Sequence, residues 1–228
     1  MVGRALRRSI RRWRRRLRTA LWLAAAVGTV WWLATRAGVS LPGGPSDDAS
    51  PEPGPAEPYD RGSWSHWVDV DGDCQDTRQE VLIAESEIPV RFRGGGRCKV
   101  ASGRWRCPYT GRVITDPRRL DVDHLVPLHE AHRSGGDRWS RPRRERYANE
   151  LDDADHLVAV EAGANRSKGD KAPDAWMPAD PDGRCQYLRQ WLSVKRRWSL
   201  RLRDEERRFI ERGLQRCDRG QVPERPAR

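Results

Sequence analysis

The distribution of apolar and polar positions divides the chain into distinct segments. An uncharged, largely apolar run covers residues 19–35, and residues 40–62 carry six prolines and four glycines with almost no apolar side chains. From Trp64 to Leu214, Trp, Leu and Val then recur among polar residues. A Pro/Gly-rich segment cannot bury enough apolar surface to fold. We therefore expect a disordered linker over 38–62, one globular domain over 63–219 and a disordered tail over 220–228.

Periodicity within the domain predicts an α+β fold with little sheet. Helix-forming residues with apolar positions three or four apart predict helices, and short β-branched runs predict strands. The expected helices cover 76–86, 128–133, 143–151 and 161–168, with two more between 183 and 216 separated near 199–204. The expected strands cover 121–126 and 156–160, and a small hairpin joins 97–101 to 104–107 through Ser102 and Gly103.

The N-terminal segment has the pattern of an export signal. Nine arginines lie between Arg4 and Arg18, directly before the apolar run, and this arrangement keeps the positive side in the cytoplasm. Residues 1–18 are therefore expected to form a cytoplasmic arm, and 19–37 an apolar helix that is a signal anchor or a signal peptide. A length of 17 uncharged residues suits either reading. In both, the domain lies outside the cytoplasm, held at the membrane or secreted.

The net charge of +11 comes mainly from this arm. Residues 1–46 contain ten arginines and no acidic residue, which leaves 34 basic and 33 acidic groups in the remainder. The charge of the domain therefore gives no indication of a nucleic-acid partner, and such an argument has to come from a site.

The cysteines fit an oxidising compartment. All five lie beyond the linker and none forms a CxxC pair, which argues against a zinc ribbon. Disulfides are the default outside the cytoplasm. Cys185 and Cys217 enclose the last two predicted helices and are expected to pair. Cys74 with Cys98 is the second expected bond, which leaves Cys107.

Two short segments, DVDHLVPLH at 121–129 and HLVAVEAGANRSKGDK at 156–171, carry the candidate chemistry. Neutral imidazole is a natural base for water near neutral pH, so His124 is the candidate general base. A carboxylate and an amide oxygen suit a hard cation such as Mg²⁺, which points to Asp123 and Asn165. Arg166 and Lys168 beside Asn165 are candidates for holding the phosphates of a nucleic acid.

These residues resemble the HNH (ββα-metal) endonucleases. Asp-His-Leu-Val-Pro followed by a strand and Asn-Arg-Ser-Lys-Gly-Asp is similar to the HNH family that includes the C-terminal domain of GmrSD restriction enzymes. The resemblance implies two strands and a helix around one divalent metal. It also implies that Asp123 and Asn165 are the metal ligands and His124 the base for hydrolysis of phosphodiester bonds in nucleic acid, with DNA as the expected substrate. Mg²⁺ is the expected metal, with Mn²⁺ or Zn²⁺ as alternatives.

Several points stay open at this level. The middle asparagine of the HNH motif has no clear counterpart, and Asn149 and His156 are the nearest candidates. Strand alternation would place Asp123 and His124 on opposite faces, so they share a site only if the strand ends or twists there. His129 and His132 are interpreted as structural. The alternative to a nuclease is a non-catalytic, envelope-anchored binding or structural module with the same fold.

Overall fold

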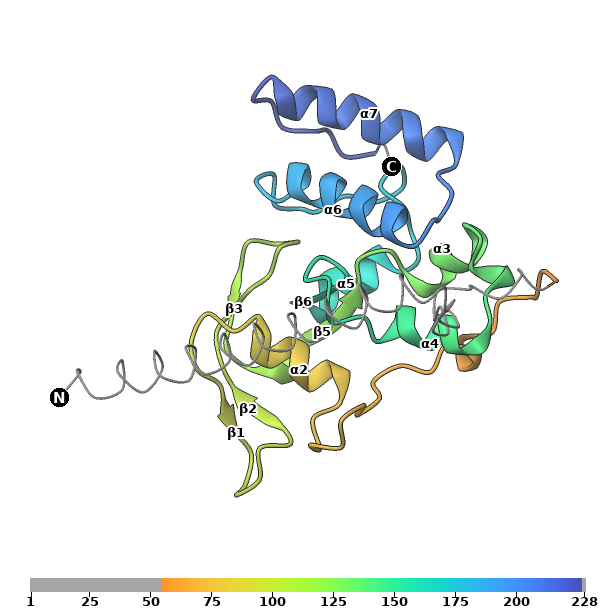
Figure 1. The fold of residues 1–228 in the computed structure, drawn as a ribbon. Coiled ribbons are helices and arrows are strands. Elements are labelled where there is room, and N and C mark those ends of the chain that lie inside the picture. Colours follow the sequence, from red (N-terminus) through yellow and green to blue (C-terminus); the bar gives the residue numbers. More distant parts are fainter. Residues whose placement is uncertain (1–54, 227–228) are drawn as a thin grey trace, which may run out of the picture. The chain divides into compact units, whose positions relative to one another are not determined.

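The computed structural model describes residues 55–226, which lie within one compact unit, Pro51–Arg228 (Figure 1). The predicted cytoplasmic arm (1–18) and apolar signal segment (19–37) lie outside the described residues. Among the residues that are described, no helix has the length and apolar character needed to cross a membrane.

Two antiparallel strands form the centre of the domain. β5 (Leu120–His124) pairs with β6 (Leu157–Glu161) over five residues, from Leu120 opposite Glu161 to His124 opposite Leu157. α5 (Ala162–Lys168) follows β6 directly and packs on both strands. Most side chains of both strands are buried, which explains why they appear in the sequence as short apolar runs instead of alternating patterns. The observed fold is α+β, as predicted.

The other elements surround this pair (Figure 1). Three short 3₁₀ turns, at Arg61–Ser63, Pro117–Arg119 and Gly136–Arg138, connect them. The remaining helices are α2 (Thr77–Ala84), α3 (Leu128–Arg133), α4 (Arg141–Ala148), α6 (Arg184–Arg197) and α7 (Asp204–Asp218). The remaining strands are β1 (Arg91–Phe92), β2 (Val100–Ser102), β3 (Trp105–Arg106) and β4 (Val113–Ile114).

Helix boundaries follow local signals in the sequence. The Asp76 side chain accepts a hydrogen bond from the Gln79 backbone at 3.0 Å and caps α2. Gly169, with φ of 57°, ends α5 in a conformation that favours glycine. α4 begins two residues before its predicted start and ends three before its predicted end, because Pro142 occupies its first turn and Asn149 caps its end.

The predicted hairpin around Ser102 and Gly103 is wrong. β2 pairs back with β1, and β3 pairs forward with β4, so no turn joins β2 to β3. Gly103 is needed for close packing instead: a Cβ there would lie 2.6 Å from the Trp105 ring and 2.7 Å from the Ser86 hydroxyl. The Trp105 indole in turn donates to the Leu82 carbonyl at 2.8 Å and fastens β3 to α2.

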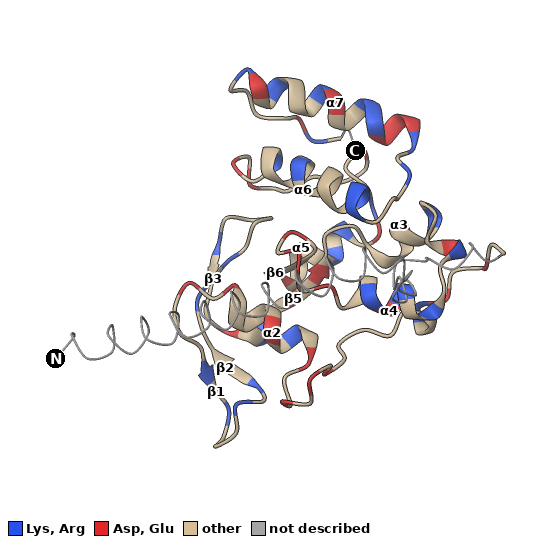
Figure 2. Cartoon of the chain, in the orientation of Figure 1, with Lys and Arg blue, Asp and Glu red and all other residues tan. Residues whose placement is uncertain are grey.

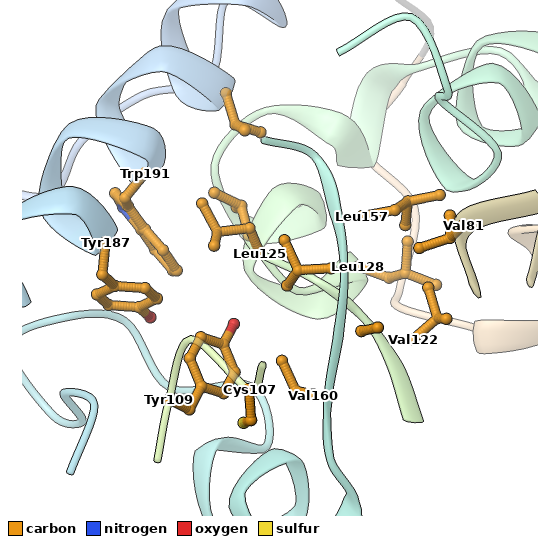
Figure 3. Close-up of a cluster of buried hydrophobic side chains, with 14 of the residues drawn as sticks. Val81, Cys107, Tyr109, Val122, Leu125, Leu128, Leu157, Val160, Tyr187 and Trp191 are labelled. Carbon is orange, nitrogen blue, oxygen red and sulfur yellow. The ribbon is translucent and has the colours of Figure 1, made fainter. Parts of the chain in front are cut away.

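The hydrophobic core joins the central strands to α6. Figure 3 shows Val160 of β6 near Tyr109 and Val122 of β5 near Val81, with Tyr187 and Trp191 of α6 on the other side of Leu125 from Val122. Trp64, Trp105 and Trp191 are almost fully buried, so these large aromatic side chains are core residues. The core therefore holds β5, the strand that carries Asp123 and His124, from both sides.

A disulfide closes the two C-terminal helices. Cys185 in the first turn of α6 is bonded to Cys217 near the end of α7, and Cys74 is bonded to Cys98. Cys107 is a buried free thiol. This pattern agrees with the predicted pairing. In the chain-entropy model, a loop of the size enclosed by Cys185 and Cys217 contributes about 3–4 kcal/mol to the free energy of unfolding.

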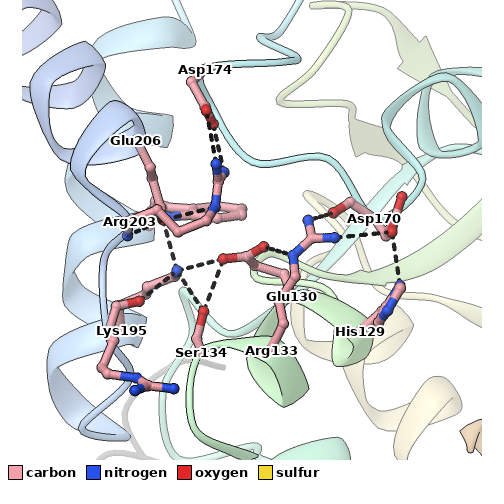
Figure 4. A network of polar contacts seen from close by, with 11 residues as sticks. His129, Glu130, Arg133, Ser134, Asp170, Asp174, Lys195, Arg203 and Glu206 are labelled. Atoms are coloured by element: carbon pink, nitrogen blue, oxygen red, sulfur yellow. Dashed lines mark hydrogen bonds and ion pairs between the residues drawn. The ribbon is translucent and has the colours of Figure 1, made fainter. Parts of the chain in front are cut away.

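Buried charges connect α3 to the same helical pair (Figure 4). The Lys195 ammonium lies 2.6 Å from Glu130 of α3 and 2.8 Å from Glu206 of α7, and all three side chains are buried. It also donates to the Ser134 hydroxyl at 2.9 Å. Removing one member would leave an unpaired buried charge, so this network constrains the position of α3.

The ends of the domain extend further than predicted. In the expected linker, Glu57 pairs with buried Arg144 at 2.9 Å, and Tyr59 stacks on His129 with ring centroids 4.4 Å apart. In the expected tail, Arg184 donates to the carbonyl of Pro223 at 3.0 Å. Residues 55–62 and this part of the tail therefore pack on the domain, although their composition predicted disorder.

Glu85 makes folding stability depend on pH. Burial raises the pKa of its carboxyl to about 7, although the Ala159 backbone N–H of β6 donates to it at 2.8 Å and opposes the shift. The folded state therefore binds this proton more tightly than the unfolded chain. The resulting stabilisation is complete below the unfolded pKa near 4.5 and is lost as the pH rises through about 7.

We expect Glu85→Gln to remove this dependence, because the amide stays neutral and can still accept from Ala159. Urea unfolding measures the free energy of unfolding at pH 5 and at pH 8. Between these two pH values, this free energy should fall by on the order of 2 kcal/mol more in the wild type than in the variant. Glu87→Gln, at an exposed carboxylate nearby, is the control. An identical loss in wild type and Glu85→Gln would refute the assignment.

Candidate functional site

A cleft of about 430 Å³ lies at the end of β5. It brings together Asp123 and His124 from the first motif with Asn165 and Arg166 from the second, although about 40 residues separate the two motifs. The start of α3 and the segment after α5 complete one side. Other lining residues come from the N-terminal part of the domain: Tyr59, Arg61 and Trp67.

His124 is held as a neutral imidazole with one free nitrogen. Its Nε2 lies 2.9 Å from the Ala148 carbonyl, which only accepts, so Nε2 carries the proton. Nδ1 is then a lone-pair acceptor, and it has no hydrogen-bond partner among residues 55–226. Burial lowers the pKa of His124 well below its usual value, and His156 lowers it further. The ring packs between Trp67 and Tyr147, which fixes its orientation.

The position of the Ala148 carbonyl depends on Asn149. The Asn149 side chain donates to the carbonyls of Ser65 and Glu145 at 2.8 Å each. Its oxygen accepts from the Val68 backbone at 3.1 Å and the Thr77 hydroxyl at 2.9 Å. Asn149 therefore anchors the end of α4, and with it the acceptor of His124. It does not line the cleft.

Asp123 is buried and already paired. One oxygen, Oδ2, accepts from the Tyr109 hydroxyl at 2.7 Å and lies 2.7 Å from the Lys168 ammonium. Burial raises the pKa of Asp123, and the charge of Lys168 opposes this shift. The other oxygen, Oδ1, has no hydrogen-bond partner in the described part of the chain. Asp123 and His124 border one cleft despite strand alternation because β5 ends at His124.

Lys168 does not lie where a substrate phosphate could reach it. Its side chain is fully buried, and its ammonium also donates to the His124 carbonyl at 3.0 Å. The expected phosphate contact is therefore corrected to an internal one: Lys168 compensates the charge of Asp123. Arg166 is exposed at the cleft, as its predicted role requires. Asn165 donates through Nδ2 to Asp121 at 3.1 Å, which leaves its oxygen without a partner among the described residues.

The cleft also contains a histidine that the sequence reading assigned a structural role. Nδ1 of His129 lies 2.8 Å from Asp170 Oδ2, and Arg133 donates to the Asp170 carbonyl at 2.8 Å (Figure 4). The His129 side chain is 42% exposed, so it can meet a ligand. His129 and Asp170 lie close to the ends of the two motif segments. This position in the sequence was the signal that could have identified them as residues of the cleft. His132 and His156 are buried outside the cleft, which for His132 fits the predicted structural role.

Comparison with known proteins shows the family to which the chain belongs. Residues 76–210 match the family described as GmrSD restriction endonucleases, C-terminal domain. The chain belongs to this family. It is also 34% identical, over 164 residues, to an uncharacterised secreted protein of Arthroderma benhamiae, which covers 72% of this chain and 78% of that protein. No solved structure matches the chain.

The match to the GmrSD C-terminal domain family contains both motif segments but begins at Asp76. Tyr59, Arg61 and Trp67 therefore belong to a part of this chain that precedes the matched region. In this member of the family, the N-terminal wall of the cleft is built from residues outside the match, and Trp67 is the residue that packs on His124.

The free donor atoms of the cleft suit a divalent cation. Asp123 Oδ1 and the Asn165 side-chain oxygen are hard ligands without other partners among the residues described, and His124 Nδ1 is a neutral imidazole nitrogen. The one group of three acidic or imidazole side chains close enough to share an ion in residues 55–226 is Asp69, Asp71 and Asp73, which are exposed and do not line the cleft. A cation in the cleft would therefore keep water or substrate as most of its ligands, as Mg²⁺ commonly does.

Lys168→Met should lower the free energy of unfolding by about 3–5 kcal/mol, because it leaves the buried Asp123 carboxylate without its cation. Adding Asp123→Asn should recover a substantial part of this loss, since no charge is then buried. Lys171→Met, at an exposed neighbouring lysine, should cost less than about 1 kcal/mol. Urea denaturation at pH 7 measures all four proteins. A double variant no more stable than Lys168→Met alone would contradict the pairing.

Proposed function

We propose that this protein is a metal-dependent endonuclease of the HNH type that hydrolyses phosphodiester bonds of DNA outside the cytoplasm. The observation that carries the proposal is the free Nδ1 of a neutral, buried histidine. His124 lines a cleft together with Asp123 and Asn165, and each of these two residues has one side-chain oxygen with no hydrogen-bond partner among the described residues. Membership of a nuclease-related family supports the same reaction.

His124 is the general base in this proposal. A base for water has to be unprotonated near neutral pH, and burial keeps its imidazole neutral. The bond from Nε2 to the Ala148 carbonyl holds the tautomer in which Nδ1 accepts a proton. Nδ1 would take the proton of the attacking water as the water oxygen bonds to phosphorus and the bond from phosphorus to the leaving oxygen breaks.

Asp123 and Asn165 would hold the divalent cation, most simply Mg²⁺. When bound, such a cation offsets the phosphate charge and increases the acidity of a coordinated water. Asp123 can offer only Oδ1, because Oδ2 is taken by Tyr109 and Lys168. The role of Lys168 is then to keep Asp123 ionised in a buried position, while Asp121 orients the Asn165 amide through Nδ2.

Arginines would hold the phosphate at the mouth of the cleft. Arg166 and Arg61 both line it and are exposed, and guanidinium groups bind phosphate oxygens through paired N–H donors. His129, oriented by Asp170, is a further donor on the same wall. These groups would position the phosphodiester so that the water near His124 lies opposite the leaving oxygen.

An extracytoplasmic location fits three observations. Two disulfides stabilise the domain, the matched fungal protein is named as secreted, and the predicted export segment precedes the domain. Disulfides persist mainly in oxidising compartments. We therefore propose that the domain acts outside the cytoplasm, either anchored through residues 19–37 or released.

The second candidate function is a non-catalytic, envelope-anchored module that retains the fold. The burial of Asp123 and its pairing with Lys168 favour this candidate, since both restrict how Asp123 can bind a cation. The two candidates differ in one respect: the enzyme relaxes supercoiled plasmid in a reaction that EDTA stops, whereas the module does not.

His124→Ala should reduce plasmid nicking in Mg²⁺ by about 10²–10⁴-fold, the usual contribution of a general base. Added imidazole should restore part of the activity, because it can enter the space left by the ring. His66→Gln, at a histidine that does not line the cleft, is the control and should stay near the wild-type rate. Nicking at the wild-type rate by His124→Ala would remove His124 from the mechanism.

Asn165→Ala should shift the Mg²⁺ concentration for half-maximal nicking upward by at least about tenfold, because one oxygen ligand is lost. The rate at saturating Mg²⁺ should change less than the half-saturation point. Ser167→Ala lies on the same helix but outside the cleft and serves as the matched control. The Asn165 assignment fails if the two variants have the same metal titration curve.

A further inference from the structure

A second cavity, of about 500 Å³, lies at the other end of α3 from the cleft. Leu128 and His129 at the start of this helix line the cleft, whereas Ser134 at its C-terminal cap lines the second cavity. Three arginines contribute to its wall: Arg138, Arg143 and Arg201. The other lining residues are Ser134, Gly135, Trp139, Ser140 and Ser199.

The cavity is positive and contains no carboxylate. None of its three arginines forms an ion pair with an acidic side chain within residues 55–226, although other arginines of the domain, such as Arg112, Arg118 and Arg203, do. Burial lowers the pKa of Arg143, and the charge of nearby Arg146 lowers it further, with no acidic group to offset them. Figure 2 shows basic residues over much of α4, which borders this cavity. Because the domain as a whole is nearly neutral, this concentration is local.

The wall of the cavity is ordered in advance of any ligand. The Arg143 guanidinium lies over the Trp139 ring, 4.8 Å from its centroid, and reaches the Trp198 carbonyl. Trp139 packs on Trp64 and Trp198. A guanidinium stacked on an indole loses little further freedom when it binds an anion.

The backbone around Arg201 is fastened to α3. The Arg201 N–H donates to the Ser134 carbonyl at 2.9 Å, and its own carbonyl accepts from Lys195 at 2.9 Å. Lys195 belongs to the buried network that joins α3 to α6 and α7 (Figure 4). The cavity and the cleft are therefore built on the same helix, at a constant separation.

We propose that this arginine cavity binds backbone phosphates of the nucleic acid whose scissile phosphate occupies the cleft. The proposal rests on the function proposed above and adds a docking site for the same substrate. The six residues of α3 span roughly 9 Å. Since one strand of a duplex carries a phosphate about every 3.4 Å along the axis, the two sites lie about two to three nucleotides apart. Docking at the cavity would fix the register of the strand in the cleft.

The test uses the full-length protein in non-ionic detergent, so that the N-terminal arginines contribute equally to every variant. Arg138→Gln/Arg143→Gln/Arg201→Gln removes the cavity charge. Arg91→Gln/Arg93→Gln/Arg97→Gln removes the same charge at exposed arginines around β1 and is the matched control. Binding of a fluorescent 20-base-pair DNA duplex is measured in EDTA by anisotropy across a series of salt concentrations, so that no cleavage occurs.

We expect the cavity variant to bind the duplex about 10- to 100-fold more weakly at low salt. The slope of log K against log salt should become less negative by about 2, corresponding to two or three lost phosphate contacts. The control should change the slope by less than about 1. Hydrolysis of bis(p-nitrophenyl) phosphate, which is too small to span both sites, should be equal in the cavity variant and wild type.

Equal slopes for the cavity variant and the control would overturn the proposal, because the effect would then be one of net charge. Heparin binding that depends on the cavity as strongly as DNA binding does would also overturn it, since the site would then recognise anionic polymers in general. A cavity-dependent slope in a protein that nicks no plasmid would support the docking site and refute the nuclease. Plasmid nicking by a protein whose salt slope does not depend on the cavity would support the nuclease and refute the docking site.

Discussion

The burial of Asp123 and His124 side by side at the end of β5 is the constraint on which the rest of the site depends. A carboxylate and an imidazole removed from water each require compensation. Lys168 and Tyr109 provide it for Asp123, and the Ala148 carbonyl provides it for His124. α5 must therefore follow β6 directly to bring Lys168 beneath the strand, and α4 must end where Asn149 anchors it. In each side chain, one polar atom makes the compensating contact. The other polar atom, Asp123 Oδ1 or His124 Nδ1, has no protein partner among the described residues.

The different contacts of the two polar atoms in each side chain relate the fold to the proposed chemistry. In each side chain one atom makes the contact that holds it in place, and in the proposed mechanism the other atom would meet a cation or a water molecule. The buried ion network of Glu130, Lys195 and Glu206 then fixes α3 against the C-terminal helices, which the Cys185–Cys217 bond holds together. α3 thus connects a rigid C-terminal support to the cleft at one end and to the arginine cavity at the other. A disulfide-supported frame of this kind suits a nuclease that works outside the cytoplasm.

The sequence predicted those features that have strong local signals. α3, α5 and the two C-terminal helices follow from periodicity and from caps such as Gly169, and both disulfides were expected from cysteine spacing. Asp123, His124, Asn165 and Arg166 do meet in one cleft. β2 and β3 were paired with each other, and β1 and β4 were not predicted, because strands of two or three residues show no usable alternation. Lys168 was assigned to the substrate phosphates because it lies close to Asn165 in the sequence. Nothing local indicated that it is buried, since lysine is rarely buried and its partner Asp123 lies 45 positions earlier. Tyr59 and Arg61 lie in a segment whose composition predicted a linker, so nothing local indicated that they line the cleft.

The proposed hydrolysis depends on His124 being a neutral imidazole whose Nδ1 can accept a proton. Nuclear magnetic resonance of protein labelled with ¹⁵N at histidine measures this directly, because the two ring nitrogens shift differently in each tautomer and in the imidazolium. For this tautomer we expect that, at pH 7 without metal, Nε2 of His124 is protonated and Nδ1 is not, and that the ring stays neutral at pH 6. A protonated Nδ1 at pH 7, or an imidazolium at pH 6, would contradict it.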